Sequence, residues 1–307
     1  MANFDVTKIR NVAVIAHGGA GKTSLTEGIL FTSGTLDRLG SVDNGTSTTD
    51  FDPEEIARKI TISSSLGFCT WSNHRINLID TPGFINFIED ARGCLKAADG
   101  AVVIVSAISG VKAETEKIWK YACEYEVPRI VFINKMDKEN ANFSRALAEL
   151  EKSFDAEAIP LQMPIGSGDT FSGIIDIIAM KAFSFKNGKH QEIAMPPEVV
   201  GEAEEYRKKL VEKIAESDDS LLERYLEGGE LTLEEIMKGV KAGSLTRRFI
   251  PVTCGSATKI MGISSLLDTI ILCLPSPLEM ARISPVRGKN TKDGKDTERK
   301  VDEKEPF

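Results

Sequence analysis

The chain has 307 residues, of which 41% are hydrophobic and 27% are charged, and its formal net charge is −8. This composition is ordinary for a folded globular protein and leaves room for one large domain or two smaller ones. The acidic balance argues against a general nucleic-acid binder, because neutralising phosphates takes clustered Lys and Arg, so we expect any RNA contact to be local or indirect.

Apolar runs rich in Val and Ile alternate with amphipathic segments along the chain. Strands are predicted over residues 11–16, 60–71, 75–80, 101–106, 129–134 and 249–254. Helices are predicted over residues 22–32, 86–98, 112–125, 142–154 and 263–274. The second and third strands are read as a hairpin. Elsewhere the alternation implies parallel crossovers, so the predicted fold class is α/β, a mostly parallel sheet with helices on both faces.

A glycine-rich loop joins the first predicted strand to the first predicted helix and reads Ala-His-Gly-Gly-Ala-Gly-Lys-Thr over residues 16–23. It is a P-loop with Ala in place of the first Gly, and such loops turn backbone N–H groups toward phosphates. Lys22 supplies charge for the β- and γ-phosphates, and the Thr23 hydroxyl is placed to ligate Mg²⁺. Residues expected to contact the nucleotide here are His17, Gly18, Gly19, Ala20, Gly21, Lys22, Thr23 and Ser24. This loop alone does not separate ATP from GTP.

A second motif, Asp-Thr-Pro-Gly over residues 80–83, follows another apolar strand, 58 residues after Lys22 (80 − 22). An acid at such a strand end can hold Mg²⁺ through water, which assigns Asp80 to the metal. The Gly83 N–H can meet a γ-phosphate oxygen, because Gly lets the backbone come close. Thr61 is a candidate to complete the Mg²⁺ shell, although by itself it is only a residue that favours strands.

A third motif, Asn-Lys-Met-Asp over residues 134–137, ends another apolar strand, predicted over residues 129–134. Guanine offers N1–H and N2–H₂ donors that one carboxylate, Asp137, can accept together, whereas adenine offers no matching pair. The stem of Lys135 can cover the purine face, and Asn134 can tie this loop to the phosphate loop. After a later strand, small residues let backbone N–H groups approach guanine O6: Gly255, Ser256 and Ala257.

These motifs, in this order, resemble those of the translational GTPases. From Asp137 to Gly255 is 118 residues (255 − 137), far more than one helix and one strand require. We therefore expect an inserted subdomain of roughly 90 residues, since structureless loops of that length are not expected in compact domains. Elongation factor G is the family with such an insert. Segments similar to its pattern are residues 163–166, 173–176, 221–228 and 272–277.

The resemblance covers nearly the whole chain and implies a P-loop GTPase domain over 1–158 and 251–280 with an inserted α+β subdomain over 159–250. Residues 281–307 are then expected to be a linker toward a second domain that lies beyond this sequence, and the polar stretch 288–305 fits a connecting segment. The resemblance also implies GTP or GDP with Mg²⁺ as ligands, a cytoplasmic location and the ribosome as partner. We expect this piece to be monomeric.

The expected insert carries several local signals. Asn187-Gly188 predicts a tight hairpin between strands 182–185 and 190–193. Thr232 with Glu235 fits a capping box, and Gly243 fits a helix stop. One helical face carries Ala203, Tyr206, Leu210 and Ile214, which we interpret as core. Five acids beside it are interpreted as a solvated face, or, by resemblance, as a surface for the ribosomal stalk protein: Glu202, Glu204, Glu205, Glu212 and Glu216.

The sequence departs from the family at three places. Phe84 stands where the family has a histidine that orients the attacking water, and Phe has no atom that can polarise water. Gly18 and Gly19 stand where the family has an apolar residue and an Asp. In the family, the apolar residue forms one side of a gate through which the histidine passes, and Ile60 keeps the other side of that gate. Lys59 replaces a hinge Gly. These changes resemble a divergent second type of elongation factor G, and we expect Phe84 to fill the space that Gly18 opens.

Two functions follow, and both remain open from the sequence. The first is a translational GTPase whose catalytic positions are Lys22, Thr61, Gly83 and position 84. The second is a ribosome-binding switch that loads GTP and hydrolyses little of it, because Phe84 replaces the histidine. A third reading is a relative of ribosomal protection or release factors.

Cysteine usage and hydropathy bear on the cellular compartment. Five cysteines show no metal-ligand spacing, and each lies in or beside an apolar segment: Cys69, Cys94, Cys123, Cys254 and Cys273. We interpret them as buried free thiols, which suits a reducing cytoplasm. No run approaches 18 apolar residues, so no membrane span is expected.

Overall fold

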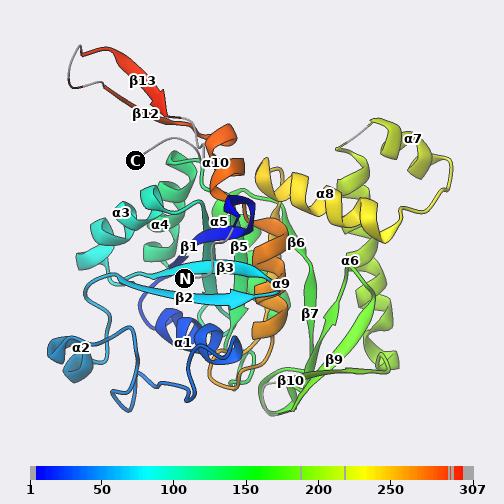
Figure 1. Ribbon diagram of the computed structural model, residues 1–307. Helices are drawn as coiled ribbons and strands as arrows, with labels where there is room; N and C mark the ends of the chain where they lie inside the picture. Colours follow the sequence, from blue (N-terminus) through cyan, green and yellow to red (C-terminus); the bar gives the residue numbers. More distant parts are fainter. Residues whose placement is uncertain (1–4, 187–188, 218, 290, 292–293, 300–307) are drawn as a thin grey trace.

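The structure is a computed structural model that describes residues 5–186, 189–217, 219–289, 291 and 294–299 (Figure 1). Within these residues the largest sheet has seven strands in the order β2-β3-β1-β4-β5-β11-β6. Its strands are β1 Ile9–Ile15, β2 Ser65–Trp71, β3 His74–Asp80, β4 Gly100–Ser106, β5 Arg129–Asn134, β6 Ala158–Pro160 and β11 Ile250–Cys254. β2 runs antiparallel to β3, and the other neighbours are parallel. The mostly parallel α/β sheet is therefore confirmed.

Helices cover both faces of this sheet. α1 (Lys22–Thr32) and α9 (Ile263–Cys273) pack against each other on one face, whereas α3 (Ile88–Ala97), α4 (Ala113–Glu124) and α5 (Phe143–Phe154) follow one another on the opposite face (Figure 1). Short 3₁₀ turns precede β1 and α3, at Val6–Lys8 and Ile85–Phe87. The central strands β4, β5 and β11 are buried on both faces, as a doubly covered parallel sheet requires.

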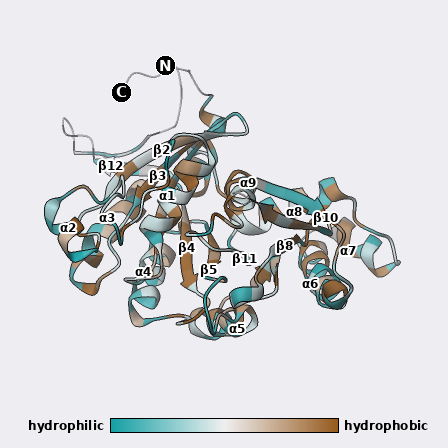
Figure 2. Ribbon diagram, turned by 90° about the horizontal axis from the view of Figure 1, so that it is seen from below, coloured by the Kyte–Doolittle hydropathy of each residue, from teal (hydrophilic) through white to brown (hydrophobic). Residues whose placement is uncertain are grey.

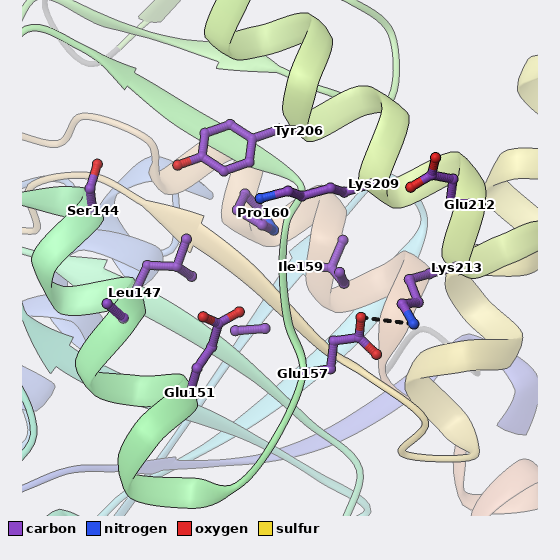
Figure 3. A pocket seen from close by; sticks show the side chains of 12 residues that line it. Ser144, Leu147, Glu151, Glu157, Ile159, Pro160, Tyr206, Lys209, Glu212 and Lys213 are labelled. Atoms are coloured by element: carbon purple, nitrogen blue, oxygen red, sulfur yellow. Dashed lines mark ion pairs between the residues drawn. The ribbon is translucent and has the colours of Figure 1, made fainter.

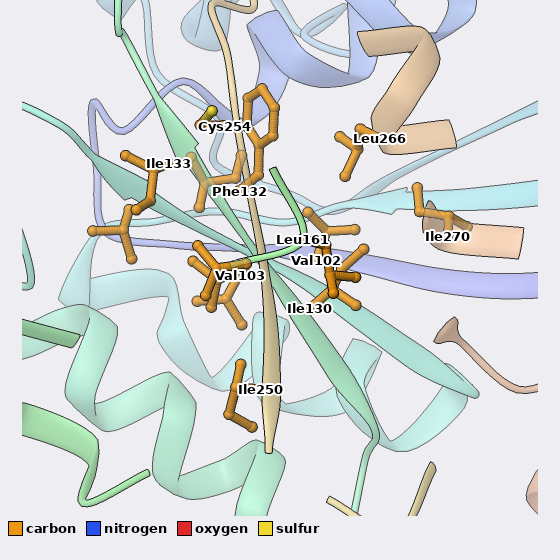
Figure 4. Packing of buried hydrophobic residues seen from close by; sticks show 14 of the residues in the cluster. Val102, Val103, Ile130, Phe132, Ile133, Leu161, Ile250, Cys254, Leu266 and Ile270 are labelled. Carbon is orange, nitrogen blue, oxygen red and sulfur yellow. The ribbon is translucent and has the colours of Figure 1, made fainter. Parts of the chain in front are cut away.

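The core lies along the central strands. Every residue of β4, β5 and β11 is buried, and in Figure 2 β4 is seen as one of the most apolar elements, inside a more polar shell. Val103, Phe132 and Leu266 belong to the cluster in Figure 4, which joins the sheet to α9. Burying a side chain of this size contributes about 1.5–3 kcal/mol each. The rigid sheet fixes the strand ends from which the three sequence motifs project.

The predicted strand over residues 60–71 begins late, at Ser65. Residues 60–64 pair with no strand of the described sheet because their backbone is used elsewhere: the N–H groups of Ile62 and Ser63 donate to Glu55, at 2.9 and 3.1 Å. Glu55 belongs to α2 (Pro53–Arg58), a short helix that the sequence patterns did not predict. The hairpin of β2 and β3 itself is confirmed, with Trp71 opposite His74 at its turn.

The insert is an antiparallel sheet backed by helices. In the described part of the chain its strands run in the order β10-β9-β8-β7. They are β7 Gln162–Ile165, β8 Gly173–Asp176, β9 Lys181–Lys186 and β10 Lys189–Ile193, followed by α6 Pro197–Ala215, α7 Asp219–Leu226 and α8 Leu233–Leu245. A 3₁₀ turn, Gly168–Thr170, links β7 to β8. β6 and β11, on either side of the insert, pair with each other in the main sheet.

Most local signals in the insert agree with the structure. β9 and β10 pair on either side of the predicted Asn187-Gly188 turn, which itself lies outside the described residues. The capping box of Thr232 and Glu235 begins α8. Gly243 as a helix stop is wrong: α8 continues to Leu245, and the ring of Phe249 packs where a side chain at Gly243 would lie. Glycine is needed there for packing, and Arg247 takes the left-handed conformation after the helix.

The expectation of five buried thiols needs correction. Cys123 is exposed and Cys94 is half-buried, so only Cys69, Cys254 and Cys273 are buried thiols. Cys123 lies on the outer side of α4, where its sulfur accepts a hydrogen bond from Arg129 at 3.0 Å. Proximity to an apolar segment does not reveal which side of a helix a residue occupies.

The segment after α9, part of which was expected to be a polar linker, contains a helix and a hairpin. α10 (Pro277–Ile283) is followed by a two-stranded antiparallel hairpin of β12 (Val286–Lys289) and β13 (Asp296–Arg299), seen in red at the top of Figure 1. Among the described residues no single helix is long and apolar enough to cross a membrane; α9 and α10 reach that length together, across a 50° bend.

Candidate functional site

The phosphate loop occupies the turn between β1 and α1. Gly19 and Gly21 have φ of 78° and 100°, a left-handed conformation that glycine adopts without strain. A Cβ on Gly21 would meet the Asn134 side-chain nitrogen at 2.5 Å, so the base loop lies directly against this turn. The glycines therefore serve both the backbone conformation and the close approach of a neighbouring loop.

Lys22 lies at the centre of the loop with its ammonium buried. Its Nζ donates to the carbonyl oxygens of Ala16 and His17, at 3.3 and 3.1 Å. A Cβ on Gly83 would collide with that Nζ, which places Gly83 beside the phosphate loop. Burial lowers the pKa of Lys22 to about 8, and the carboxylates of Asp80 and Asp50 act in the opposite direction. The lysine is close to two acids and available to an anion.

His17 is a buried side chain on the same loop. Its Nδ1 lies 2.9 Å from the Thr115 hydroxyl, and its Nε2 lies 3.4 Å from the Ser109 hydroxyl. Burial lowers the pKa of His17 to about 4, with the charges of Lys112 and Lys22 acting in the same direction. The imidazole is therefore neutral at pH 7, and it anchors the phosphate loop to the start of α4.

Two hydroxyls and two carboxylates meet at the start of α1. The Thr23 and Thr61 hydroxyl oxygens are 3.0 Å apart, and Thr61 donates to Asp50 Oδ1 at 2.8 Å. Thr49 donates to Asp80 Oδ2 at 3.1 Å. Within the described residues, Asp80 Oδ1 and Asp50 Oδ2 are buried without a hydrogen-bond partner. Oxygen donors left unsatisfied in this way suit a hard divalent cation.

The pKa shifts of the two carboxylates also support a cation at this oxygen cluster. Burial raises the pKa of Asp80 to about 6, although Lys22 and two threonine hydroxyls lower it. Burial also raises the pKa of Asp50. A cation between the two carboxylates would favour their charged forms. The residues present thus fit Mg²⁺, with Thr23, Thr61 and Asp80 as the predicted set and Asp50 beside them.

Sequence reasoning missed Asp50 and Thr49. Both precede Thr61 by about a dozen residues in a stretch with several other acids, and no motif marks them. Only the folding back of this stretch onto α1 brings Asp50 to the Thr61 hydroxyl. The one available signal was the Thr-Thr-Asp sequence at 48–50, which is too common to single out.

The base loop is fastened to its neighbours through Asn134. Its side-chain N–H₂ donates to the Ala20 carbonyl oxygen at 2.9 Å, and its Oδ1 accepts from the Ala257 N–H at 3.0 Å. Lys135 donates to the Gly19 carbonyl oxygen at 2.7 Å. Three loops that are far apart in sequence thus form one connected wall, as predicted for Asn134.

Asp137 and the loop after β11 complete this wall. Asp137 Oδ1 is buried without a partner among the described residues, while its Oδ2 lies 3.6 Å from the Lys138 ammonium. Gly255 accepts from the Met136 N–H at 3.1 Å, and a Cβ on Gly255 would meet the Phe132 ring at 2.9 Å. Ser256 is buried and bridges to Met261. The unsatisfied carboxylate oxygen is an acceptor that a base edge could fill.

Phe84 lies against the phosphate loop. A Cβ on Gly18 would come within 2.8 Å of the Phe84 ring, so the ring occupies the space that any larger residue at position 18 would need. Phe84 is 39% exposed, so part of its ring surface remains open to solvent. Gly18 and Phe84 are therefore sterically matched, and the expectation that Phe84 fills the space opened by Gly18 agrees with this packing.

Groups from each of the three motifs line one cleft of about 530 Å³, although Asp137, Gly255 and Ser256 are not among its lining residues. One wall consists of residues 39–61, here called the covering segment, which contributes Asp50, Lys59 and Thr61 to the lining. The opposite wall is the phosphate loop with Lys135 and Ala257. Asp80 and Asn134 are buried and do not line the cleft themselves, but each is hydrogen-bonded to a residue of a wall.

A second cavity, of about 410 Å³, lies between α5 and α6 (Figure 3). It is lined by Tyr206, Lys209 and Glu151 among others, and Lys213 forms an ion pair with Glu157 at 3.0 Å on its margin. This cavity contains none of the motif residues. We therefore place the candidate site in the 530 Å³ cleft.

Comparison with known proteins agrees with this geometry. The family model described as "Elongation factor Tu GTP binding domain" matches residues 7–276. The chain belongs to the elongation factor Tu GTP-binding domain family. Within this family, elongation factor G of Thermotoga neapolitana is 45% identical over 306 residues, and that of Thermotoga maritima is 44% identical over the same length. The match covers 99% of this chain and 44% of each relative.

A solved structure shares the fold of this GTP-binding domain. A crystal structure of a Thermus thermophilus protein superimposes with a TM-score of 0.85 at 36% identity, covering 92% of this chain and 42% of that chain. The chain thus contains a GTP-binding domain of this family and is similar in sequence to elongation factor G, and it spans less than half the length of the relatives it matches.

Proposed function

We propose that this chain binds GTP and GDP with Mg²⁺ and hydrolyses GTP to GDP and phosphate during translation, in the manner of elongation factor G. The observation that carries the proposal is the convergence of three sequence motifs on one 530 Å³ cleft. The phosphate loop and part of the metal-suited oxygen cluster line this cleft, and Asp137 belongs to the loop whose Lys135 and Lys138 also line it. Family membership and the 45% identity to a protein named elongation factor G agree with this.

The proposed roles follow from the contacts of each residue. The loop from His17 to Ser24 cradles the phosphates with its N–H groups, and Lys22 neutralises their charge. Thr23, Thr61 and Asp80 would hold Mg²⁺, directly or through water, with Asp50 adding a second carboxylate. The bound metal would supply charge neutralisation on the phosphate oxygens.

Guanine selectivity is proposed to rest on Asp137. A carboxylate with one buried oxygen that lacks a partner favours a ligand with adjacent N–H donors and rejects one without them, because that oxygen would stay unpaired. Lys135 would cover the base, and Gly255, Ser256 and Ala257 would offer backbone groups toward its far edge. Asn134 acts by holding these loops together.

Phe84 is the feature that decides between turnover and a GTP-loaded switch. The phenyl ring cannot accept or donate the hydrogen bond that would activate water, and losing such a group costs about 10²–10⁴-fold in rate. We propose that backbone groups near Thr61 and Gly83 hold the attacking water instead, so that hydrolysis persists. The alternative, a GTP-loaded ribosome-binding switch, is favoured by the close packing of Phe84 on Gly18.

GTP turnover with and without ribosomes, for the parent and for Phe84→His, tests these two functions. Ribosome-stimulated turnover by the parent is the expected result. Tight GTP binding without turnover in the parent, rescued by the histidine, would establish the switch instead. Because an imidazole at position 84 enters a site shaped for a phenyl ring, Phe84→Leu serves as the control for altered packing.

We also propose the ribosome, including its stalk protein, as the partner, a cytoplasmic location and a monomeric state. The division into a GTPase domain (1–158 and 251–280), an insert (159–250) and a following linker (281–307) is part of this proposal. Four of the five acids on and after α6 are exposed, and Glu212 is half-buried, so a charged partner could reach them. Reversing their charge should reduce ribosome-stimulated turnover and leave basal turnover unchanged.

A further inference from the structure

Glu27 is a buried carboxylate on α1 that the nucleotide motifs do not include. Its side chain is fully buried, at 0% exposure. Oε1 accepts hydrogen bonds from the Thr48 N–H at 2.6 Å and the Ser47 hydroxyl at 3.3 Å. Oε2 accepts from the Gly40 N–H at 3.1 Å and the Thr48 hydroxyl at 3.4 Å. All four of these donors belong to the covering segment.

Glu27 lies one helical turn beyond Thr23. Residues four apart in a helix share a face, so Thr23 and Glu27 point the same way from α1. Thr23 meets the far end of the covering segment at Thr61, and Glu27 meets its beginning between Gly40 and Thr48. One face of one helix therefore holds the covering segment at two places.

The stretch between these two attachments carries the oxygen cluster. Thr49 follows directly after Thr48 and donates to Asp80, and Asp50 accepts from Thr61. Because hydrogen bonds to a charged acceptor are roughly twice as strong as neutral ones, Glu27 fixes Thr48 firmly. The position of Thr48 in turn limits where Thr49 and Asp50 can lie.

We propose that Glu27 is a positioning residue for the metal-binding set: it fixes residues 40–48 on α1 and thereby brings Asp50 and Thr61 to Thr23 and Asp80. This inference rests on the proposed function, because it assigns the cluster to Mg²⁺. The hydrogen bonds of Glu27 go to the covering segment and not to the phosphate loop or the base loop. Its effect should therefore fall on binding that needs the covering segment and not on binding of the base and the first phosphates.

The test compares Glu27→Gln with the parent, by titrating a fluorescent, slowly hydrolysed GTP analogue and fluorescent GDP over a range of Mg²⁺ concentrations. The amide keeps the shape of the side chain and loses the charge and one acceptor. We expect Mg²⁺-supported binding of the analogue to weaken about tenfold, as for loss of a charged hydrogen bond, with GDP binding changed less than about twofold. Equal weakening of both nucleotides, or of neither, would overturn the proposal.

Gly40→Ala perturbs the same contact from the other side, since a Cβ there would collide with Glu27 Oε2 and would also meet the Thr46 carbonyl oxygen of the covering segment at 2.7 Å. Gly40→Ala should also weaken Mg²⁺-supported binding of the GTP analogue more than binding of GDP. The double variant should lose less binding free energy than the sum of the two single variants, because both substitutions disturb the contact between Glu27 and Gly40. Fully additive losses would contradict the inference. Thr48→Ala is the matched control: it removes one weak hydroxyl contact and keeps the N–H donor, so a change below about twofold is expected.

Amide hydrogen exchange gives a readout that needs no nucleotide. In Glu27→Gln the amides of Gly40 and Thr48 should exchange faster, whereas the amides within α1 should not change. Unchanged exchange at Gly40 and Thr48 would overturn the inference even if the parent binds GTP. A parent chain that binds no guanine nucleotide would instead overturn the proposed function, and the exchange measurement would still decide whether Glu27 holds the covering segment.

Discussion

The wall that would hold the base and phosphates and the wall that would hold the metal are built in different ways. The first consists of short loops at strand ends that hydrogen-bond to one another through Asn134. The second is one long segment, residues 39–61, held by side-chain contacts to Glu27, Asp80 and Thr23. The first wall keeps Lys22, Thr23 and Asn134 of the family motifs but departs from the family at the Gly18-Gly19 pair, whereas the second wall departs at Lys59. Phe84, the remaining departure, packs against Gly18.

The largest expected effect lies on the first wall. Asp137→Asn replaces an acceptor-only carboxylate by a group that presents a donor to the base edge, so affinity for GTP should fall roughly 10²–10³-fold. Competition titration against a fluorescent guanine nucleotide measures this. Lys138→Ala removes the 3.6 Å ion pair to Asp137 and one side chain of the cleft lining but keeps the carboxylate, so affinity should fall far less, and this variant serves as the control. An unchanged affinity in Asp137→Asn would contradict the assignment of Asp137 to guanine recognition.

The Gly18–Phe84 pair tests the contact between the phosphate loop of the first wall and the residue that departs from the family after β3. Gly18→Ala places a Cβ within 2.8 Å of the Phe84 ring and should displace the ring, weakening GTP binding by about tenfold. Phe84→Ala opens space, so the double variant should bind as well as Phe84→Ala alone. The measurement is the GTP affinity of the parent, of Gly18→Ala, of Phe84→Ala and of the double variant. If Gly18→Ala remains equally harmful without the ring, the phosphate-loop backbone itself needs glycine there.

Folding stability is expected to depend on pH through His17, which lies in the phosphate loop of the first wall. The pKa of His17 is lowered to about 4 by burial, against about 6.5 unfolded, so the unfolded chain binds more protons between these values. Stability from this group is present above pH 6.5 and is lost as pH falls toward 4, by up to about 2 kcal/mol. Urea unfolding from pH 4.5 to 7.5 should show a shallower dependence in His17→Gln. Parallel curves for parent and variant would show that burial does not shift this imidazole.

The smallest expected effect concerns Lys59 on the second wall. Its φ of 55° is left-handed, which costs about 1 kcal/mol for a residue with a Cβ. Lys59→Gly should therefore raise stability by about 0.5–1 kcal/mol in urea unfolding. Ala57→Gly, in the neighbouring helix α2, should lower stability by about 1 kcal/mol and is the matched control. A destabilised Lys59→Gly would mean that the lysine makes a contact worth more than the strain.

The two walls also differ in how well the sequence predicted them. β1, β5 and α1 and the contacts of Asn134 followed from strand-end motifs, because rigid parallel strands bring their carboxyl ends to one edge. The covering segment did not follow: α2, Asp50 and Glu27 depend on how a long stretch folds back onto α1. Such a fold is set by individual hydrogen bonds between residues far apart in sequence, which no periodic pattern encodes. Phe84 was predicted to fill space at Gly18, since a residue lost on one side of a contact invites a larger one opposite.

Nucleotide selectivity with and without Mg²⁺ tests the central claim most directly. The measurement is competition of GTP, GDP and ATP for the site of a fluorescent guanine nucleotide, in excess Mg²⁺ and in chelator. The account predicts that GTP and GDP compete, that ATP binds at least about 10³-fold more weakly, and that Mg²⁺ strengthens GTP binding. Equal competition by ATP and GTP, or GTP binding that Mg²⁺ leaves unchanged, would contradict it.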